Sequence, residues 1–264
     1  MFRALLIKAS LYLFAVLPLP LSHAIGALIG AVLARLPGRI RSVTRTNIDL
    51  CFPDRSSQER QRLVNASLRE TGKTVLEIGA LWLRPGWMVL RLIREVDGIG
   101  PVEAAQAMGQ GIILATHHLG AWEVAGLYCA ANYDITCLYR PLRMKERDAL
   151  VRNARSRAGG NYVPTTAQGI RTLYRTLGEN RAVAMLPDQE PQAGAGTFAP
   201  FFGIPAYTMM FLSRLAIKTG APIVFVWSER LSFGRGYRLH FRPVLAAAYD
   251  NDLAVSVAAI NSSV

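Results

Sequence analysis

The chain has 264 residues, enough for one large domain or two small ones, and 51% of them are hydrophobic, a fraction too low for a protein with many membrane spans. It carries 30 basic and 18 acidic side chains, a formal net charge of +12, and 26 of the basic ones are arginine. Guanidinium groups favour phosphate and carboxylate, so the expected partner is anionic: a membrane surface, a phosphorylated substrate, an acidic protein or nucleic acid.

Residues 1–36 are expected to form a membrane anchor. No Asp, Glu, Lys or Arg occurs from Ala9 to Ala34, and this stretch of 26 residues exceeds the roughly 20 that a spanning helix needs. Pro18 and Pro20 would kink such a helix, so the segment is expected either to cross once or to lie in the interface as two short helices.

Two features bear on the orientation and fate of this segment. Four arginines follow it: Arg35, Arg39, Arg41 and Arg45. The positive-inside tendency therefore places the rest of the chain in the cytoplasm. A cleaved signal peptide is the competing interpretation, because Ser22-His23-Ala24 resembles a cleavage site. The apolar character continues past that point, which favours an uncleaved anchor.

Residues 37–264 are expected to form one α/β domain whose first portion, 37–105, is helical and amphipathic. Ser56 is a predicted N-cap, with Glu59 three residues further on to complete a capping box. Around Pro85 lies an apolar patch with Trp82 and Trp87, which fits core packing or a second membrane contact.

From Gly111 onward, short apolar runs alternate with helical patterns. The predicted strands are 111–116, 135–139, 161–164, 181–186, 222–228 and 237–241, and the predicted helices are 121–131, 145–158, 167–177 and 207–219. This alternation predicts a mostly parallel sheet flanked by helices, with an antiparallel last strand after the turn at residues 234–236. The three cysteines have no metal-ligand spacing, so free thiols are expected, with neither a metal site nor a cofactor: Cys51, Cys129 and Cys137.

The segment His117-His118-Leu119-Gly120-Ala121-Trp122-Glu123 follows the first of these strands. The carboxyl ends of strands line the ligand crevice in open α/β folds, so His118 is expected at a site, with His117 in support. An imidazole just before the helix can fold back to Glu123, a pairing that would raise the basicity of its free nitrogen. With no Ser or Cys nucleophile nearby, the pair predicts general-base catalysis on a hydroxyl that attacks an acyl group. A structural His–carboxylate contact is the alternative that the spacing leaves open.

Two further segments complete the predicted site. Residues 187–203 follow another strand and contain Asp188, Gln189 and two glycines, Gly194 and Gly196, that permit close approach to a ligand, although a plain surface loop has the same composition. Residues 140–181 hold ten basic side chains and three acidic ones, a belt suited to phosphate or to an acidic carrier protein.

These segments together resemble the late lipid A acyltransferases, the lauroyl and myristoyl transferases within the lysophospholipid-acyltransferase superfamily. The resemblance covers nearly the whole chain and rests on five segments: Asn47-Ile48-Asp49-Leu50-Cys51-Phe52-Pro53, the HxxxxE of His118 and Glu123, Tyr139-Arg140-Pro141, Arg155-Ser156-Arg157, and Asp188-Gln189 leading to Phe198-Ala199-Pro200-Phe201-Phe202-Gly203. Members of the family usually continue with a Trp-x-His-Arg-Arg segment. The sequence stops at Val264 without it, so a truncated chain is one expectation.

The resemblance implies a glycerolipid-acyltransferase-like fold and transfer of a fatty acyl chain from acyl carrier protein to a hydroxyl of a lipid A precursor. It implies His118 as general base with Glu123 as its orienting partner. Substrate-binding or supporting roles fall to Arg140, Arg155, Arg157, Asp188 and Gln189. The same chemistry suits another acceptor, such as a lysophospholipid or a phosphatidylinositol mannoside, and a non-catalytic binder of anionic lipid is the rival from another class. Nucleic acid is set aside, because no recognition motif occurs.

Overall fold

The structure, a computed structural model, describes residues 2–139, 141, 145–244 and 246–263. The chain divides into two compact units. Unit 1 comprises Met1–Leu92, Phe202–Ile204 and Arg230–Gly236, and unit 2 comprises Ile93–Phe201, Pro205–Glu229 and Tyr237–Val264. The functional division expected at residue 36 stays a prediction.

Unit 1 is helical, and its helices are α1 Phe2–Val16, α2 Leu19–Leu33, α3 Arg39–Cys51, α4 Ser57–Leu83 and α5 Gly86–Leu90. The apolar amino-terminal segment is broken at Pro18, the N-cap of α2, because proline lacks the amide that a continuous helix requires. In the part of the chain that the structure describes, no helix is both long and apolar enough to cross a membrane. The expected kinked spanning helix is not supported. The segment forms two short helices, and their expected place in the membrane interface stays a prediction.

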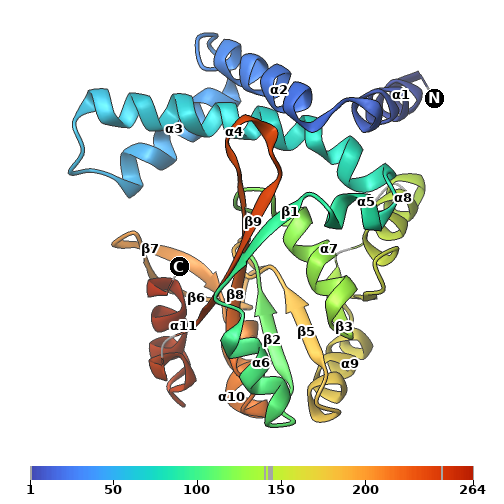
Figure 1. Cartoon of the computed structure of the whole chain (residues 1–264). Helices are drawn as coiled ribbons and strands as arrows, with labels where there is room; N and C mark the ends of the chain where they lie inside the picture. Colours follow the sequence, from blue (N-terminus) through green and yellow to red (C-terminus); the bar gives the residue numbers. More distant parts are fainter. Residues whose placement is uncertain (1, 140, 142–144, 245, 264) are drawn as a thin grey trace. The chain divides into compact units, whose positions relative to one another are not determined.

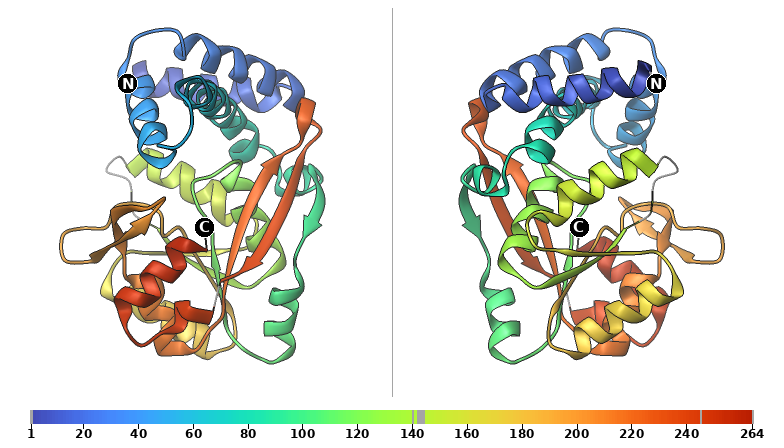
Figure 2. Two further views of the ribbon diagram at one scale, coloured as in Figure 1. Left: turned by 90° about the vertical axis from the view of Figure 1, so that its left-hand side faces the viewer. Right: turned by 90° about the vertical axis from the view of Figure 1, so that its right-hand side faces the viewer.

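Helices α1 and α2 both lie along α4 (Figure 2). Glycines allow the backbones of α2 and α4 to touch: a Cβ added to Gly26 would lie 2.6 Å from the Gly72 carbonyl oxygen, and one added to Gly30 would lie 2.2 Å from that of Leu68. The predicted capping box starts α4, since the Glu59 amide donates to Ser56 Oγ at 3.3 Å and the Ser56 amide donates to Glu59 Oε2 at 2.9 Å. Local sequence thus sets where α4 begins, and small residues set how closely α2 approaches it.

A buried ionic cluster holds the rest of unit 1 to α4. His23 Nε2 lies 2.9 Å from Glu77 Oε2, and Arg230 donates from Nε to the same oxygen at 3.0 Å. Arg230 also reaches Glu70 Oε2 at 3.1 Å and Thr74 Oγ1 at 2.7 Å. The cluster joins α2, α4 and the segment 230–236, which carries the short helix η1 Ser232–Gly234.

The remaining elements are β1 Ile93–Asp97, α6 Gly100–Ala107, β2 Ile112–Ala115, α7 Trp122–Asn132, β3 Ile135–Tyr139, α8 Lys145–Ser156, β4 Asn161–Pro164, α9 Ala167–Gly178, β5 Ala182–Met185, β6 Gly196–Phe201, β7 Ile204–Met209, α10 Phe211–Thr219, β8 Ile223–Arg230, β9 Tyr237–Pro243, η2 Ala246–Tyr249 and α11 Leu253–Ser262. The described residues form a seven-stranded sheet of order β1-β9-β8-β2-β5-β3-β4 (Figure 1). Strand β2 is parallel to β5 and β8, β3 is parallel to β4 and β5, and β1 is parallel to β9. The expected mostly parallel α/β sheet is confirmed.

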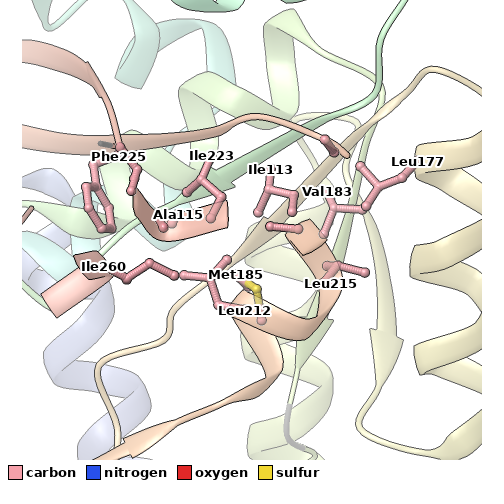
Figure 3. Packing of buried hydrophobic residues seen from close by; sticks show 14 of the residues in the cluster. Ile113, Ala115, Leu177, Val183, Met185, Leu212, Leu215, Ile223, Phe225 and Ile260 are labelled. Carbon is pink, nitrogen blue, oxygen red and sulfur yellow. The ribbon is translucent and has the colours of Figure 1, made fainter. Parts of the chain in front are cut away.

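Apolar side chains cover both faces of this sheet. Alternate residues of β2 point to opposite sides: Ile113 joins Val183, Leu212 and Leu215 in one core (Figure 3), whereas Leu114 joins a core with residues of α6 and α7. Helices α9, α10 and α11 supply the first core. Because β2 is a central strand buried on both faces, it fixes the position of the segment that follows its carboxyl end, which begins at Thr116.

Two parts of the expected secondary structure are wrong. Strand β1 lies in the portion expected to be helical, 37–105, because its charged side chains pair across the sheet edge: Arg238 Nε donates to Glu95 Oε2 at 2.6 Å, and Arg242 Nη2 donates to Asp97 Oδ2 at 2.6 Å. The β6–β7 hairpin replaces both the expected loop and the start of the helix expected at 207–219, and it packs against α11 (Figure 2). The first error involves a partner distant in sequence, β9, which a local pattern does not contain. The second involves two short strands adjacent in sequence, which are joined by a turn at Phe202 and Gly203.

Candidate active site

The turn from β2 to α7 fixes the position of His118. The Thr116 amide donates to the Met185 carbonyl of β5 at 3.0 Å, and the Ala121 amide donates to the Ser228 carbonyl of β8 at 3.0 Å. Between them Gly120 adopts a φ of +60°, and a Cβ there would lie 2.3 Å from the Ser228 oxygen. The turn is therefore tied to both neighbours of β2, and it is possible only with glycine at this position.

His118 is paired with Asp188. The His118 amide donates to Asp188 Oδ2 at 2.7 Å, and the ring Nδ1 lies 2.9 Å from Oδ1. Burial works against the charge of Asp188, but the hydrogen bonds from the His118 ring and amide outweigh it and lower the pKa of the carboxyl group. An ionised carboxylate requires a proton on Nδ1, so Nε2 carries the free lone pair, with Gln189 Nε2 3.4 Å away.

Glu123 is hydrogen-bonded to Arg155, whereas the spacing predicted a pairing with His118. Its carboxylate is only 4% exposed and accepts hydrogen bonds from Arg155 of α8, at 2.7 Å from Nη2 and 3.2 Å from Nε. Burial would lower the pKa of the guanidinium, but the hydrogen bond and charge of Glu123 raise it. Glu123 lies in the first turn of α7, as expected, but Arg155 occupies its carboxylate and Asp188 occupies the Nδ1 of His118.

Trp122 lies between the two pairs. Its ring meets the His118 ring edge-on with centroids 4.9 Å apart, and the Arg155 guanidinium lies 5.2 Å from its centroid. The Glu123–Arg155 pair thus fixes the tryptophan that packs against His118. Among the described side chains, Glu123 has no hydrogen bond to His118 and is linked to its ring only through Arg155 and Trp122.

His117 faces the opposite way. Its ring packs on Phe225 with centroids 4.8 Å apart, and burial lowers the pKa of its imidazole despite the nearby charge of Asp188. A neutral His117 forms part of the wall of a pocket.

This pocket lies beside His117, Asp188 and Gln189 and has a volume of about 100 Å³. Its other walls come from β6, β7, α10 and α11 and are mostly apolar, including Phe201, Tyr207, Met209, Leu212, Val257 and Ile260. The Tyr207 hydroxyl accepts hydrogen bonds from the Gly194 and Gly196 amides at 2.9 and 3.1 Å, which fastens the preceding loop to the hairpin. Sequence reasoning missed the walls on β6 and β7, because these segments were expected to be a loop and the start of a helix. The alternation of Tyr207 and Met209 with the smaller Ala206 and Thr208 was the available signal.

Comparison with known proteins gives this geometry its context. The chain matches the family described as bacterial lipid A biosynthesis acyltransferase over residues 2–264. It belongs to this family. The resemblance drawn from the sequence is confirmed, and the protein is an acyltransferase.

Relatives of the chain include two proteins of Escherichia coli (strain K12). It is 28% identical to the lipid A biosynthesis palmitoleoyltransferase over 256 residues, which cover 92% of this chain and 82% of the relative. It is 26% identical to the lipid A biosynthesis lauroyltransferase over 255 residues, 96% of this chain and 82% of the relative. A phosphatidylinositol mannoside acyltransferase of Mycobacterium tuberculosis (strain ATCC 25618 / H37Rv) is 26% identical over 204 residues, 74% of this chain and 63% of the relative.

The other predicted site residues are placed as follows. Arg157 is half-buried on the segment after α8, where burial lowers the pKa of its guanidinium and the charge of Glu123 partly offsets this. Arg140 lies outside the described residues. The basic belt is partly neutralised within the fold, since Arg155 pairs with Glu123 and Arg181 pairs with Glu179 and Asp134. Among the residues with described positions, no cluster of His, Cys, Asp or Glu is suited to hold a metal ion.

Proposed function

We propose that this acyltransferase moves a fatty acyl group from an acyl carrier protein thioester to a hydroxyl of a lipid A precursor, with His118 as the general base. The observation that carries this proposal is the pairing of His118 Nδ1 with Asp188, which in the neutral imidazole places the ring proton on Nδ1 and the lone pair on Nε2. A base positioned in this way is the group that hydroxyl attack on a thioester requires.

In the proposed reaction Nε2 of His118 takes the proton of the acceptor hydroxyl as its oxygen bonds to the thioester carbonyl carbon. The tetrahedral intermediate then collapses, the carbon–sulfur bond breaks, and the imidazolium returns the proton to the departing thiolate. Asp188 is a positioning residue that holds the tautomer and stabilises the imidazolium charge. Glu123 and Arg155 are proposed to act through Trp122, and Gln189 donates toward Nε2 until the hydroxyl displaces it.

We assign the acyl chain to the apolar pocket beside His117. Its volume of about 100 Å³ is well below the roughly 300 Å³ at which small-molecule sites begin, so chain entry requires the β6–β7 hairpin or α11 to yield. The acceptor is tested together with the acyl donor, because one relative is named a phosphatidylinositol mannoside acyltransferase.

Purified full chain supplied with acyl carrier protein thioesters or acyl-coenzyme A, and with lipid A precursor or phosphatidylinositol mannoside, tests both substrates. We expect transfer from the carrier protein to the lipid A precursor and loss of about 10²-fold or more in His118→Ala. A folded His118→Ala protein with undiminished transfer would refute the catalytic assignment. Transfer to the mannoside alone would refute the acceptor.

We also propose that the enzyme acts at the cytoplasmic face of the inner membrane. Large apolar side chains are exposed along α1, α2 and α3 of unit 1, including Tyr12, Leu13, Leu28, Ile29, Ile40 and Val43. Phe233 in η1 is 90% exposed, and it lies next to α2 because Gly234 packs on Pro20. Apolar side chains beside arginines are typical of an interfacial surface.

Binding to vesicles tests this surface. Phe233→Ser removes one exposed aromatic ring, and we expect about tenfold weaker binding or more, because burying a phenylalanine side chain contributes roughly 1.5–3 kcal/mol. Met108→Ser is the matched control, since Met108 is a 65% exposed apolar side chain in unit 2. Equal losses in both variants would rule out a specific docking role for η1.

A further inference from the structure

Unit 1 contains a second pocket with a different character, here called the arginine pocket. It has a volume of about 290 Å³ and lies where α2, α3 and α4 meet. Its walls are Ala31, Ala34, Arg35, Arg41, Gln61, Asn65 and Arg69. Three of the seven lining residues are arginines and none is acidic, so the pocket concentrates positive charge in a small space.

These arginines are left without anionic partners. Within the described part of the chain, Arg35, Arg41 and Arg69 form no ion pair with a carboxylate, whereas other arginines of unit 1 do: Arg60 lies 2.8 Å from Asp49, and Arg230 pairs with Glu70 and Glu77. The Nε of Arg41 is buried and has no hydrogen-bond partner among the described atoms. A buried guanidinium donor without an acceptor is unfavourable, and an anion in the pocket would supply one.

Two amide side chains of the pocket wall, Gln61 and Asn65, add a further hydrogen-bond donor. Arg45 donates to Gln61 Oε1, and Gln61 Nε2 donates to Asn65 Oδ1 at 2.8 Å. This relay occupies both amide oxygens, with the orientation of each amide assigned from the network. It leaves the Asn65 NH₂ group as a hydrogen-bond donor beside the arginines. The polar groups that the walls still offer are therefore donors, which is the pattern that a phosphate group with its several acceptor oxygens satisfies.

The surroundings point to a phosphate that belongs to a lipid. Exposed apolar side chains alternate with the pocket arginines along the end of α2 and the start of α3: Val32 and Leu36 flank Arg35, and Ile40 and Val43 flank Arg41. Arg41 also lies in the first turn of α3, where the helix dipole favours a negative charge. We propose that the arginine pocket binds the phosphate group of an anionic phospholipid, separately from the His118 site of unit 2.

The test compares Arg41→Gln with Arg62→Gln in the full chain. Arg62 is an exposed arginine of α4 that does not line the pocket, so both variants lose the same charge. Binding is measured by co-sedimentation with phosphatidylcholine vesicles that do or do not contain phosphatidic acid. We expect Arg41→Gln to weaken binding to the anionic vesicles about tenfold or more, the usual effect of losing a charged hydrogen bond, and Arg62→Gln to change it little. Arg69→Gln, at an exposed lining position, should repeat the loss if Arg41→Gln folds poorly.

A second arm identifies the source of the phosphate. Inorganic phosphate alone is added to each protein while the melting temperature is followed. One outcome is that inorganic phosphate raises the melting temperature of the wild type but not that of Arg41→Gln or Arg69→Gln, while both variants still bind vesicles as the wild type does. The pocket would then be a phosphate site for a soluble compound, and the lipid assignment would be overturned. If Arg41→Gln, Arg69→Gln and Arg62→Gln lose vesicle binding equally and none alters the response to phosphate, the pocket contributes only general charge and the proposal fails.

Discussion

Asp188 accepts two hydrogen bonds from one residue, His118: one from its backbone amide at 2.7 Å and one from its imidazole Nδ1 at 2.9 Å. The first fixes where the residue lies and the second fixes which ring nitrogen carries the proton. The carboxylate comes from the segment after β5 and the histidine from the segment after β2, and these two strands are neighbours in the sheet. The pairing therefore follows directly from the strand order.

Asp188→Asn should abolish most of the acyl transfer. The amide can present its NH₂ group to Nδ1, which would move the ring proton to Nε2 and remove the lone pair that acts as base. We expect the rate to fall by about 10²-fold or more, as for the loss of general-base catalysis. Asp134→Asn changes an exposed carboxylate that pairs with Arg181, and transfer should persist. Normal turnover by a folded Asp188→Asn protein would show that Asp188 does not set the tautomer.

His118 was identifiable from sequence because its position depends on local features, namely an apolar strand, a glycine turn and the start of a helix. The partner of His118 was not, because HxxxxE places Glu123 close along the chain while the fold brings Asp188 from 70 residues away. The same difference separates β3, which was predicted, from β1, which was not. Strand β3 is apolar and is correctly bounded, whereas β1 is recognisable only from its charge pairs with β9.

Gly120→Ala should displace His118 and destabilise unit 2. A Cβ at Gly120 would lie 2.3 Å from the Ser228 carbonyl oxygen, and the φ of +60° costs an L-residue roughly 1–2 kcal/mol even without that clash. Because a shift of about 1 Å in a catalytic group can cost about 10² in rate, transfer should fall along with the melting temperature.

Gly126→Ala provides the matched control for this change. Gly126 lies within α7, and a Cβ there would meet nothing within 4 Å, so alanine should stabilise the helix by roughly 0.5–1 kcal/mol and leave transfer intact. Equal effects of the two substitutions on activity would contradict the role given to the turn.

Arg155 and Glu123 should behave as one unit. Arg155→Met leaves a carboxylate that is 4% exposed without its partner, and we expect a loss of about 3–5 kcal/mol in the free energy of unfolding. Adding Glu123→Leu removes the orphaned charge, so the double variant should be less destabilised than the sum of the single ones, with a coupling of roughly 0.5–3 kcal/mol. Urea unfolding of the four proteins gives this value. A second cycle between Glu123→Leu and His118→Ala should show much weaker coupling, and strong coupling there would restore the pairing first expected from the spacing.

Glu77→Gln should destabilise unit 1 in a pH-dependent way. Burial alone would raise the pKa of this carboxyl group, but its hydrogen bonds and charge contacts with His23 and Arg230 outweigh burial and lower it. A folded-state pKa below the unfolded value of roughly 4.3 means that the charged group stabilises the fold above that pH, and that this stabilisation is lost as the pH falls through the folded pKa. We expect Glu77→Gln to cost about 3 kcal/mol near neutral pH, the usual penalty for breaking a buried pair.

Below a pH of about 4.3 the wild type progressively protonates Glu77 and comes to resemble the glutamine variant, so the gap in unfolding free energy should narrow there. Glu70→Gln tests whether burial is the cause. Glu70 contacts the same Arg230 at 3.1 Å from the same helix, but its side chain is 47% exposed, and its removal should cost no more than about 1 kcal/mol. Two outcomes would contradict this prediction: equal losses of unfolding free energy in Glu70→Gln and Glu77→Gln, or a difference between the wild type and Glu77→Gln that widens below a pH of about 4.3. Either would show that the ionised carboxylate of Glu77 does not hold η1 and α2 to α4.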